Sequence, residues 1–165
     1  KLYDNIVSYL SSLFSSGSMT EEQATQTAGM MYILSDIERT DALCTEATES
    51  LQSILEKKHK LSPEAVEDLC RGLQIIEDMY QNVLEVIRTG NGEDARKIVH
   101  KKDNVLDLTL KLRKNHMKRV KQGACDAEMT SDFTRILHSF DRIGNSCANI
   151  ADAALTGVSF ESVLK

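Results

Sequence analysis

The sequence predicts an all-α protein folded as an up-and-down antiparallel helical bundle. Apolar residues recur at steps of three, four and seven along most of the chain, and no segment alternates with period two. The 165 residues include a single proline, Pro63, so little interrupts long helices. Short connections between long helices make consecutive helices antiparallel neighbours.

Five helices are expected from local start and stop signals. A capping box formed by Thr20 and Gln23 begins the second helix, and Ser62 followed by Pro63 begins the third. Glycine-containing turns separate the third helix from the fourth and end the fourth. The expected helices are Tyr3 to Ser15, Thr20 to about Lys58, Ser62 to Thr89, Glu93 to Gln122, and Met129 to Val158.

Each helix carries one apolar stripe that is expected to face the core. The stripes include Leu51 and Leu55 in the second helix, Val66 and Leu73 in the third, and Leu106 and Leu110 in the fourth.

The charge balance excludes some classes of function. The chain has 20 Lys and Arg against 25 Asp and Glu, a net charge of −5, so no nucleic-acid partner is expected. No run of about 18 apolar residues is present, so no membrane span is expected. The first residues lack the apolar core of a signal peptide, and the helix-like start without Met is typical of a fragment of a longer protein.

The cysteines are scattered and show no spacing typical of a zinc site. They are expected to be reduced thiols in the core, which favours a cytosolic location. They are Cys44, Cys70, Cys125 and Cys147.

An internal repeat is indicated by shifting the chain by 103 residues, which places Ile33 on Ile136. The same shift places Glu38-Arg39 on Asp141-Arg142 and Cys44 on Cys147. Residues 1–60 are therefore interpreted as a partial first repeat of two helices, and residues 61–165 as a complete second repeat of three. The absent first helix would leave an apolar groove, through which the fragment is expected to form a homodimer.

Polar residues on the fourth and fifth helices form a candidate metal site. Asp103 and Asp107 share one side of the fourth helix, and Asp141 and Asn145 repeat this spacing on the fifth. If the helices pack together, these oxygens suit a hard cation, and His100 would extend the choice to iron, zinc or nickel. The alternative is a solvated acidic flank, with counterions from Lys101, Lys102 and Arg142.

Two groups of basic residues have structural explanations. Arg39 and Arg142 are expected to form ion pairs with neighbouring helices, through acids such as Asp36 or Asp78. A basic run at the end of the fourth helix complements the helix dipole, and the alternative is a patch for anionic lipid headgroups or an acidic partner. The run comprises Lys111, Arg113, Lys114, His116, Lys118, Arg119 and Lys121.

Catalysis finds little support in the sequence. It has no glycine-rich phosphate loop, no Gly-x-Ser-x-Gly and no His-Glu-x-x-His, and its four histidines are dispersed. The protein is therefore expected not to be an enzyme.

Residues 140–152, FDRIGNSCANIAD, resemble the Glu-Arg-Ile-Gly-Asp-His-Ala-x-Asn-Ile-Ala-Glu stretch of PhoU domains, which regulate phosphate uptake. Residues 112–125, LRKNHMKRVKQGAC, are similar to the C-terminal end of sodium/phosphate cotransporter family proteins. The first repeat agrees through residues 9–13, YLSSL, and 35–39, SDIER.

The resemblance implies tandem three-helix bundles with the first one truncated. It also implies a regulatory domain at the cytoplasmic face of the cell membrane, whose partner is the membrane portion of the same transporter. Some PhoU domains bind metal clusters through Glu/Asp-x-x-x-Asp motifs, so a divalent or iron-type metal ion is a possible cofactor. The positions that match are Asp103, Asp107, Asp141, Asp4 and Glu38, and Asn145 stands where the second Asp of the last-helix motif belongs.

Two other functions stay open at this point. One is a metal-dependent helical-bundle enzyme or a metal-storage protein that uses a carboxylate and histidine cluster. Its ligands would be His100, Asp103, Asp107 and Asp141. The other is a helical adaptor that binds no ligand.

Overall fold

The computed structural model describes residues 2–155, and this part of the chain is helical without any strand, as predicted. The expected end of the last helix at Val158 lies outside the described residues. The elements are α1 (Leu2–Ser15), α2 (Glu21–Glu56), α3 (Pro63–Thr89), α4 (Gly92–Lys121), a short 3-10 helix (Ala127–Met129) and α5 (Thr130–Leu155).

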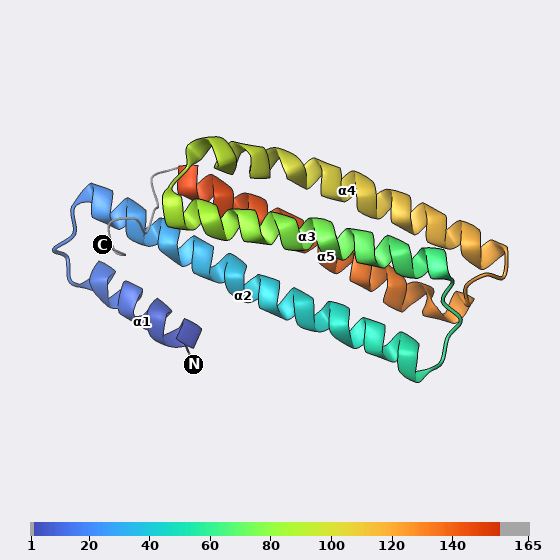
Figure 1. The fold of residues 1–165 in the computed structure, drawn as a ribbon. Coiled ribbons are helices and arrows are strands. Elements are labelled where there is room, and N and C mark those ends of the chain that lie inside the picture. Colours follow the sequence, from blue (N-terminus) through green and yellow to red (C-terminus); the bar gives the residue numbers. More distant parts are fainter. Residues whose placement is uncertain (1, 156–165) are drawn as a thin grey trace.

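The four long helices run side by side in alternating directions, so the predicted antiparallel bundle is confirmed (Figure 1). The central helix is α5, which packs against α2, α3 and α4. The short α1 lies along the first part of α2 (Figure 1). Within residues 2–155, none of the helices combines the length and apolar character that a membrane span requires.

The predicted helix starts are present as local hydrogen bonds. The backbone N of Gln23 donates to Thr20 Oγ1 over 3.2 Å, and the backbone N of Thr20 donates to Gln23 Oε1 over 2.9 Å. Ser62 caps α3 by accepting from the backbone N of Ala65. Gly90 ends α3 in the left-handed conformation, with φ of 68°, which glycine adopts without strain.

Close packing around α5 forms the core. The Phe133 and Leu137 side chains are fully buried. Gly72 of α3 touches the Phe140 ring, because a Cβ added there would lie 2.8 Å from two ring carbons. Gly144 lets the Val105 side chain of α4 approach the α5 backbone in the same way. These contacts bring α3 and α4 directly onto α5.

The predicted stripe of α4 is right at its start, where Ala95 and Ile98 are buried, and wrong by about one residue farther along the helix. Leu106 and Leu110 are 45% and 50% exposed, whereas Val105 and Leu112 are buried. One position rotates a side chain by about 100° around the helix. The true stripe was obscured because it contains polar residues, of which His116 is fully buried.

The stripes predicted for α2 and α3 are also partly exposed. The buried side of α2 includes Ile33, Leu43 and Ile54, whereas Leu51 and Leu55 project beside it. The helix thus has a second apolar side that α5 does not cover.

The prediction of four core thiols is half wrong. Cys125 and Cys147 are buried, but Cys44 and Cys70 are exposed. All four are free thiols, as expected.

Candidate functional site

The predicted metal ligands of the second repeat lie on the outside of the bundle. Asp103, Asp107 and His100 are exposed on α4, and Asp141 is half-buried on α5. The side-chain amide of Asn145 donates to the backbone oxygen of Asp141 over 2.9 Å, so it is bonded to its own helix.

The equivalent residues of the first repeat, Asp4 and Glu38, are exposed on α1 and α2. Partial burial and the nearby Glu38 carboxylate raise the pKa of the Tyr3 hydroxyl, to which Glu38 is hydrogen-bonded. Between residues 2 and 155, no three His, Cys, Asp or Glu side chains come together in a group that could hold a metal ion. As placed, these donors do not fit a metal centre, and the metal site stays a prediction.

Arg39, from the acid–arginine pair of the predicted first repeat, forms a different ion pair from the one expected. Arg39 pairs with Asp36 one turn earlier on its own helix, at 3.5 Å, rather than with a neighbouring helix. The link between helices comes from Ser146 Oγ of α5, which donates to Asp36 Oδ1 over 3.1 Å. Asp36 is therefore a structural residue between α2 and α5.

A buried ion pair that the sequence did not reveal joins α3 to α4. Arg119 Nη1 donates to Asp68 Oδ2 over 2.8 Å, and the two side chains are only 12% and 10% exposed. The two residues are 51 positions apart, and Arg119 is hidden within a longer basic run. The one available signal was the position of Asp68, one residue before the apolar Leu69 of the predicted stripe.

His116 is also part of the interior rather than of a solvated run. Its ring stacks on Phe133 with centroids 4.1 Å apart, and its Nε2 lies 3.2 Å from Thr130 Oγ1. Burial and the nearby Arg119 charge lower the pKa of the His116 imidazole. The remaining exposed part of the basic run consists of Lys111, Lys114, Lys118 and Lys121.

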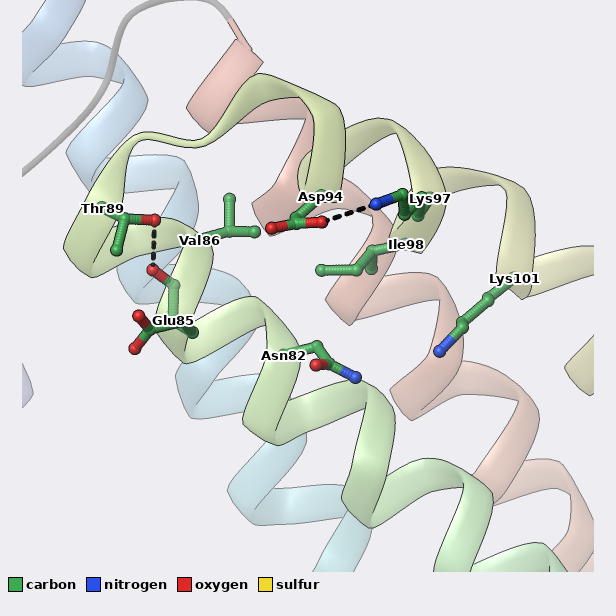
Figure 2. A pocket seen from close by; sticks show the side chains of 8 residues that line it. All are labelled: Asn82, Glu85, Val86, Thr89, Asp94, Lys97, Ile98 and Lys101. Atoms are coloured by element: carbon green, nitrogen blue, oxygen red, sulfur yellow. Dashed lines mark hydrogen bonds and ion pairs between the residues drawn. The ribbon is translucent and has the colours of Figure 1, made fainter.

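A small polar pocket of about 130 Å³ lies between α3 and α4 near their connecting loop (Figure 2). Of its charged groups, all but Lys101 form ion pairs within residues 2–155. Lys97 Nζ contacts Asp94 at 2.9 Å and Glu93 at 3.0 Å, and Glu85 pairs with Arg88 on its own helix. With these charges satisfied, the pocket offers a ligand few free polar groups.

A larger groove of about 360 Å³ separates α2 from the first half of α3, and its floor is α5. We call it the α2–α3 groove. Its lining is almost entirely apolar, and it contains several leucines that the sequence had assigned to the core. The lining residues are Ala47, Thr48, Leu51 and Leu55 of α2, Leu61 of the loop, Val66, Leu69, Cys70 and Leu73 of α3, and Ile136 and Phe140 of α5.

A comparison with protein families matches residues 69–154, about half of the chain, to the PhoU domain. The chain belongs to the PhoU domain family. A search of the curated proteins finds no match. PhoU domains are associated with the regulation of phosphate transport, and the family is regulatory rather than catalytic, in agreement with the expectation of a protein that is not an enzyme.

The PhoU match runs from α3 to the end of α5 and lies within the predicted second repeat. It contains Asp103, Asp107, Asp141 and Asn145. The interpretation of residues 1–60 as a partial first repeat stays a prediction. The α2–α3 groove lies at the edge of the PhoU match, because its α2 wall is outside the matched residues and most of its α3 wall is inside them.

Proposed function

We propose that this PhoU domain regulates a sodium-dependent phosphate transporter from the cytoplasmic face of the membrane. Its partner would be the membrane portion of the same transporter. The observation that carries the proposal is the PhoU match over residues 69–154. The similarity of residues 112–125 to sodium/phosphate cotransporter family proteins supports the transporter context.

Regulation by this domain would work through conformational coupling. A partner that binds one arrangement of the helices more tightly shifts the population toward that arrangement. One side of α2 is open along the α2–α3 groove, while its other side packs against α5 as extensively as α4 does. A partner that covers this open side would act on the position of α2.

The proposal is tested by expressing the complete reading frame in cells that lack phosphate uptake. Labelled phosphate uptake is measured with sodium and with a sodium substitute, before and after phosphate starvation. We expect sodium-dependent uptake, and we expect that deleting residues 1–165 removes its response to phosphate supply. Uptake that is independent of sodium, or regulation that survives the deletion, would contradict the proposal.

Point variants test whether regulation requires the folded domain. Gly72→Leu drives a large side chain into the Phe140 ring and is expected to act like the deletion. Leu106→Gln, at an exposed position of α4, is the matched control and is expected to keep regulation intact.

Metal binding is a separate proposal that the family resemblance alone supports. Elemental analysis of the purified chain tests it, with Asp103→Ala/Asp107→Ala as the variant. A stoichiometric metal that this variant loses would support the site. Metal content that the two substitutions leave unchanged would count against it. Because both carboxylates are exposed, the variant is expected to change the free energy of unfolding by less than about 0.5 kcal/mol.

A further inference from the structure

The α2–α3 groove holds apolar side chains in contact with water on both of its walls. Leu51 and Leu55 of α2 are 39% and 64% exposed, and Val66 and Leu73 of α3 are 44% and 56% exposed. Single exposed leucines are common on protein surfaces, but a contiguous set that lines one groove is typical of an interaction site.

Carboxylates flank both walls of this groove. Glu56 of α2 and Glu67 of α3 lie beside the lined stretch, whereas Asp41 and Glu77 lie beyond it, toward the end where the two helices converge, and all four are exposed. None of the four forms an ion pair with any other residue in the range 2–155. Unpaired charges of one sign beside an apolar groove favour a ligand with the opposite charge on its flanks.

The charged residues at the two ends of the groove differ from those along its edges. At one end α2 and α3 converge, where Tyr80 of α3 lies close enough to Cys44 and Asp41 of α2 to interact electrostatically with them. At the other end the segment between the helices carries three exposed lysines. Lys57 pairs with Asp132, the Nζ of Lys60 donates to the backbone oxygen of Gly123, and the third is Lys58. Arg71 points away from the groove, since it is about 140° around α3 from Val66. The carboxylates therefore lie in two places, Glu56 and Glu67 along the long edges and Asp41 and Glu77 at the converging end.

The size of the groove decides between possible occupants. Eleven residues line it, whereas a standard protein interface uses about 20–30 residues on each side. A second copy of the chain would therefore need much more surface than the groove supplies. From Ala47 to Leu55 the α2 wall extends for about 12 Å, a little over two turns of helix. This length suits one helix that inserts apolar side chains at positions i, i+3 or i+4, and i+7.

We propose that the α2–α3 groove is a docking site for a basic amphipathic helix of a protein partner. Leucine-like side chains of that helix would cover Leu55 and Leu73, and its Lys or Arg residues would lie beside Glu56 and Glu67. The proposal concerns this chain alone and does not depend on the transporter context, so each can fail without the other.

The test uses a labelled peptide of about 16 residues, long enough to form a helix, with leucines at i, i+3, i+4 and i+7 and lysines on both flanks. A second peptide keeps the leucines and replaces each lysine with glutamate. Fluorescence anisotropy with the 165-residue chain is expected to show roughly tenfold tighter binding of the lysine peptide.

Two double variants locate the binding. Leu55→Gln/Leu73→Gln removes apolar side chains from both walls of the groove and is expected to weaken binding roughly tenfold or more. Leu106→Gln/Leu110→Gln changes two leucines of α4 that are 45% and 50% exposed and is expected to leave binding unchanged. Circular dichroism confirms that both variants stay helical.

Three results would overturn the proposal. They are equal binding of the lysine and glutamate peptides, binding that Leu55→Gln/Leu73→Gln does not weaken, and a dimer of the wild-type chain that this variant converts to a monomer. The last result, from analytical ultracentrifugation, would show that a second copy occupies the groove.

Discussion

The two long interfaces of α5 are built from different chemistry. Against α2, the contacts include hydrogen bonds such as Ser146 to Asp36 and Ser53 to Asp132, and four of the eight buried residues of α2 are polar. Against α4, the contacts include the stacking of His116 on Phe133 and the close approach of Val105 to the α5 backbone. The two interfaces are similar in extent and differ in chemistry. Hydrogen bonds between polar side chains contribute more against α2, whereas packing contributes more against α4, where the polar contact is that of His116 with Thr130.

The largest expected effect is at the α4–α5 interface. Phe133→Ala removes a fully buried ring and leaves a cavity beside His116, so the free energy of unfolding is expected to fall by about 3–5 kcal/mol. Urea denaturation measures the change, with Leu106→Ala at an exposed position as the control. A loss of less than about 1 kcal/mol would show that packing does not dominate this interface.

The buried ion pair between α3 and α4 gives the next largest effect. Asp68→Asn leaves the Arg119 guanidinium buried beside a neutral amide, and about 3 kcal/mol of stability is expected to be lost. The double variant Asp68→Leu/Arg119→Met removes both charges and is expected to recover most of this loss. The control is Glu67→Gln, at the exposed neighbouring position. If the double variant is as unstable as Asp68→Asn, packing of the side chains rather than charge pairing explains the loss.

A smaller effect is expected at the α2–α5 interface. Ser146→Ala removes the hydrogen bond to Asp36, which keeps its contact with Arg39, so the cost is expected to be about 1 kcal/mol. Ser139→Ala is a matched control on the same helix, because Ser139 Oγ is buried without a hydrogen-bond partner in the described structure. Its removal should be neutral or slightly stabilising. Equal costs for the two substitutions would mean that the bond to Asp36 contributes nothing measurable.

The boundaries of the helices were predictable because they depend on neighbours in sequence. Thr20 with Gln23 and Ser62 with Pro63 contain the whole capping signal within four residues, and each starts its helix as expected. Which side of a helix becomes buried depends instead on distant partners. A stripe drawn only through apolar residues therefore included Leu106 and missed His116.

The same reasoning explains what could be predicted of the candidate site. The interpretation of an incomplete first repeat led us to expect an apolar groove. It did not identify the residues of the α2–α3 groove, because Leu55 and Leu73 had been assigned to the core. The pairing of Asp68 with Arg119 joins two helices whose relative rotation no local pattern specifies. Spacing within one helix could place Asp103 beside Asp107 but could not place either against α5.

The smallest expected effect is a pH dependence of the free energy of unfolding that comes from His116, at the α4–α5 interface. Because the pKa of His116 is lowered below its usual 6.5 in the folded chain, the unfolded chain binds more protons in the window below that value. The free energy of unfolding should therefore decrease as the pH falls from about 6.5 toward the lowered pKa. His116→Phe keeps a ring that can stack on Phe133 but cannot titrate, so its stability should lack this slope. His138→Gln, at an exposed histidine, should retain the slope, and a slope that survives in His116→Phe would assign the pH dependence to other groups.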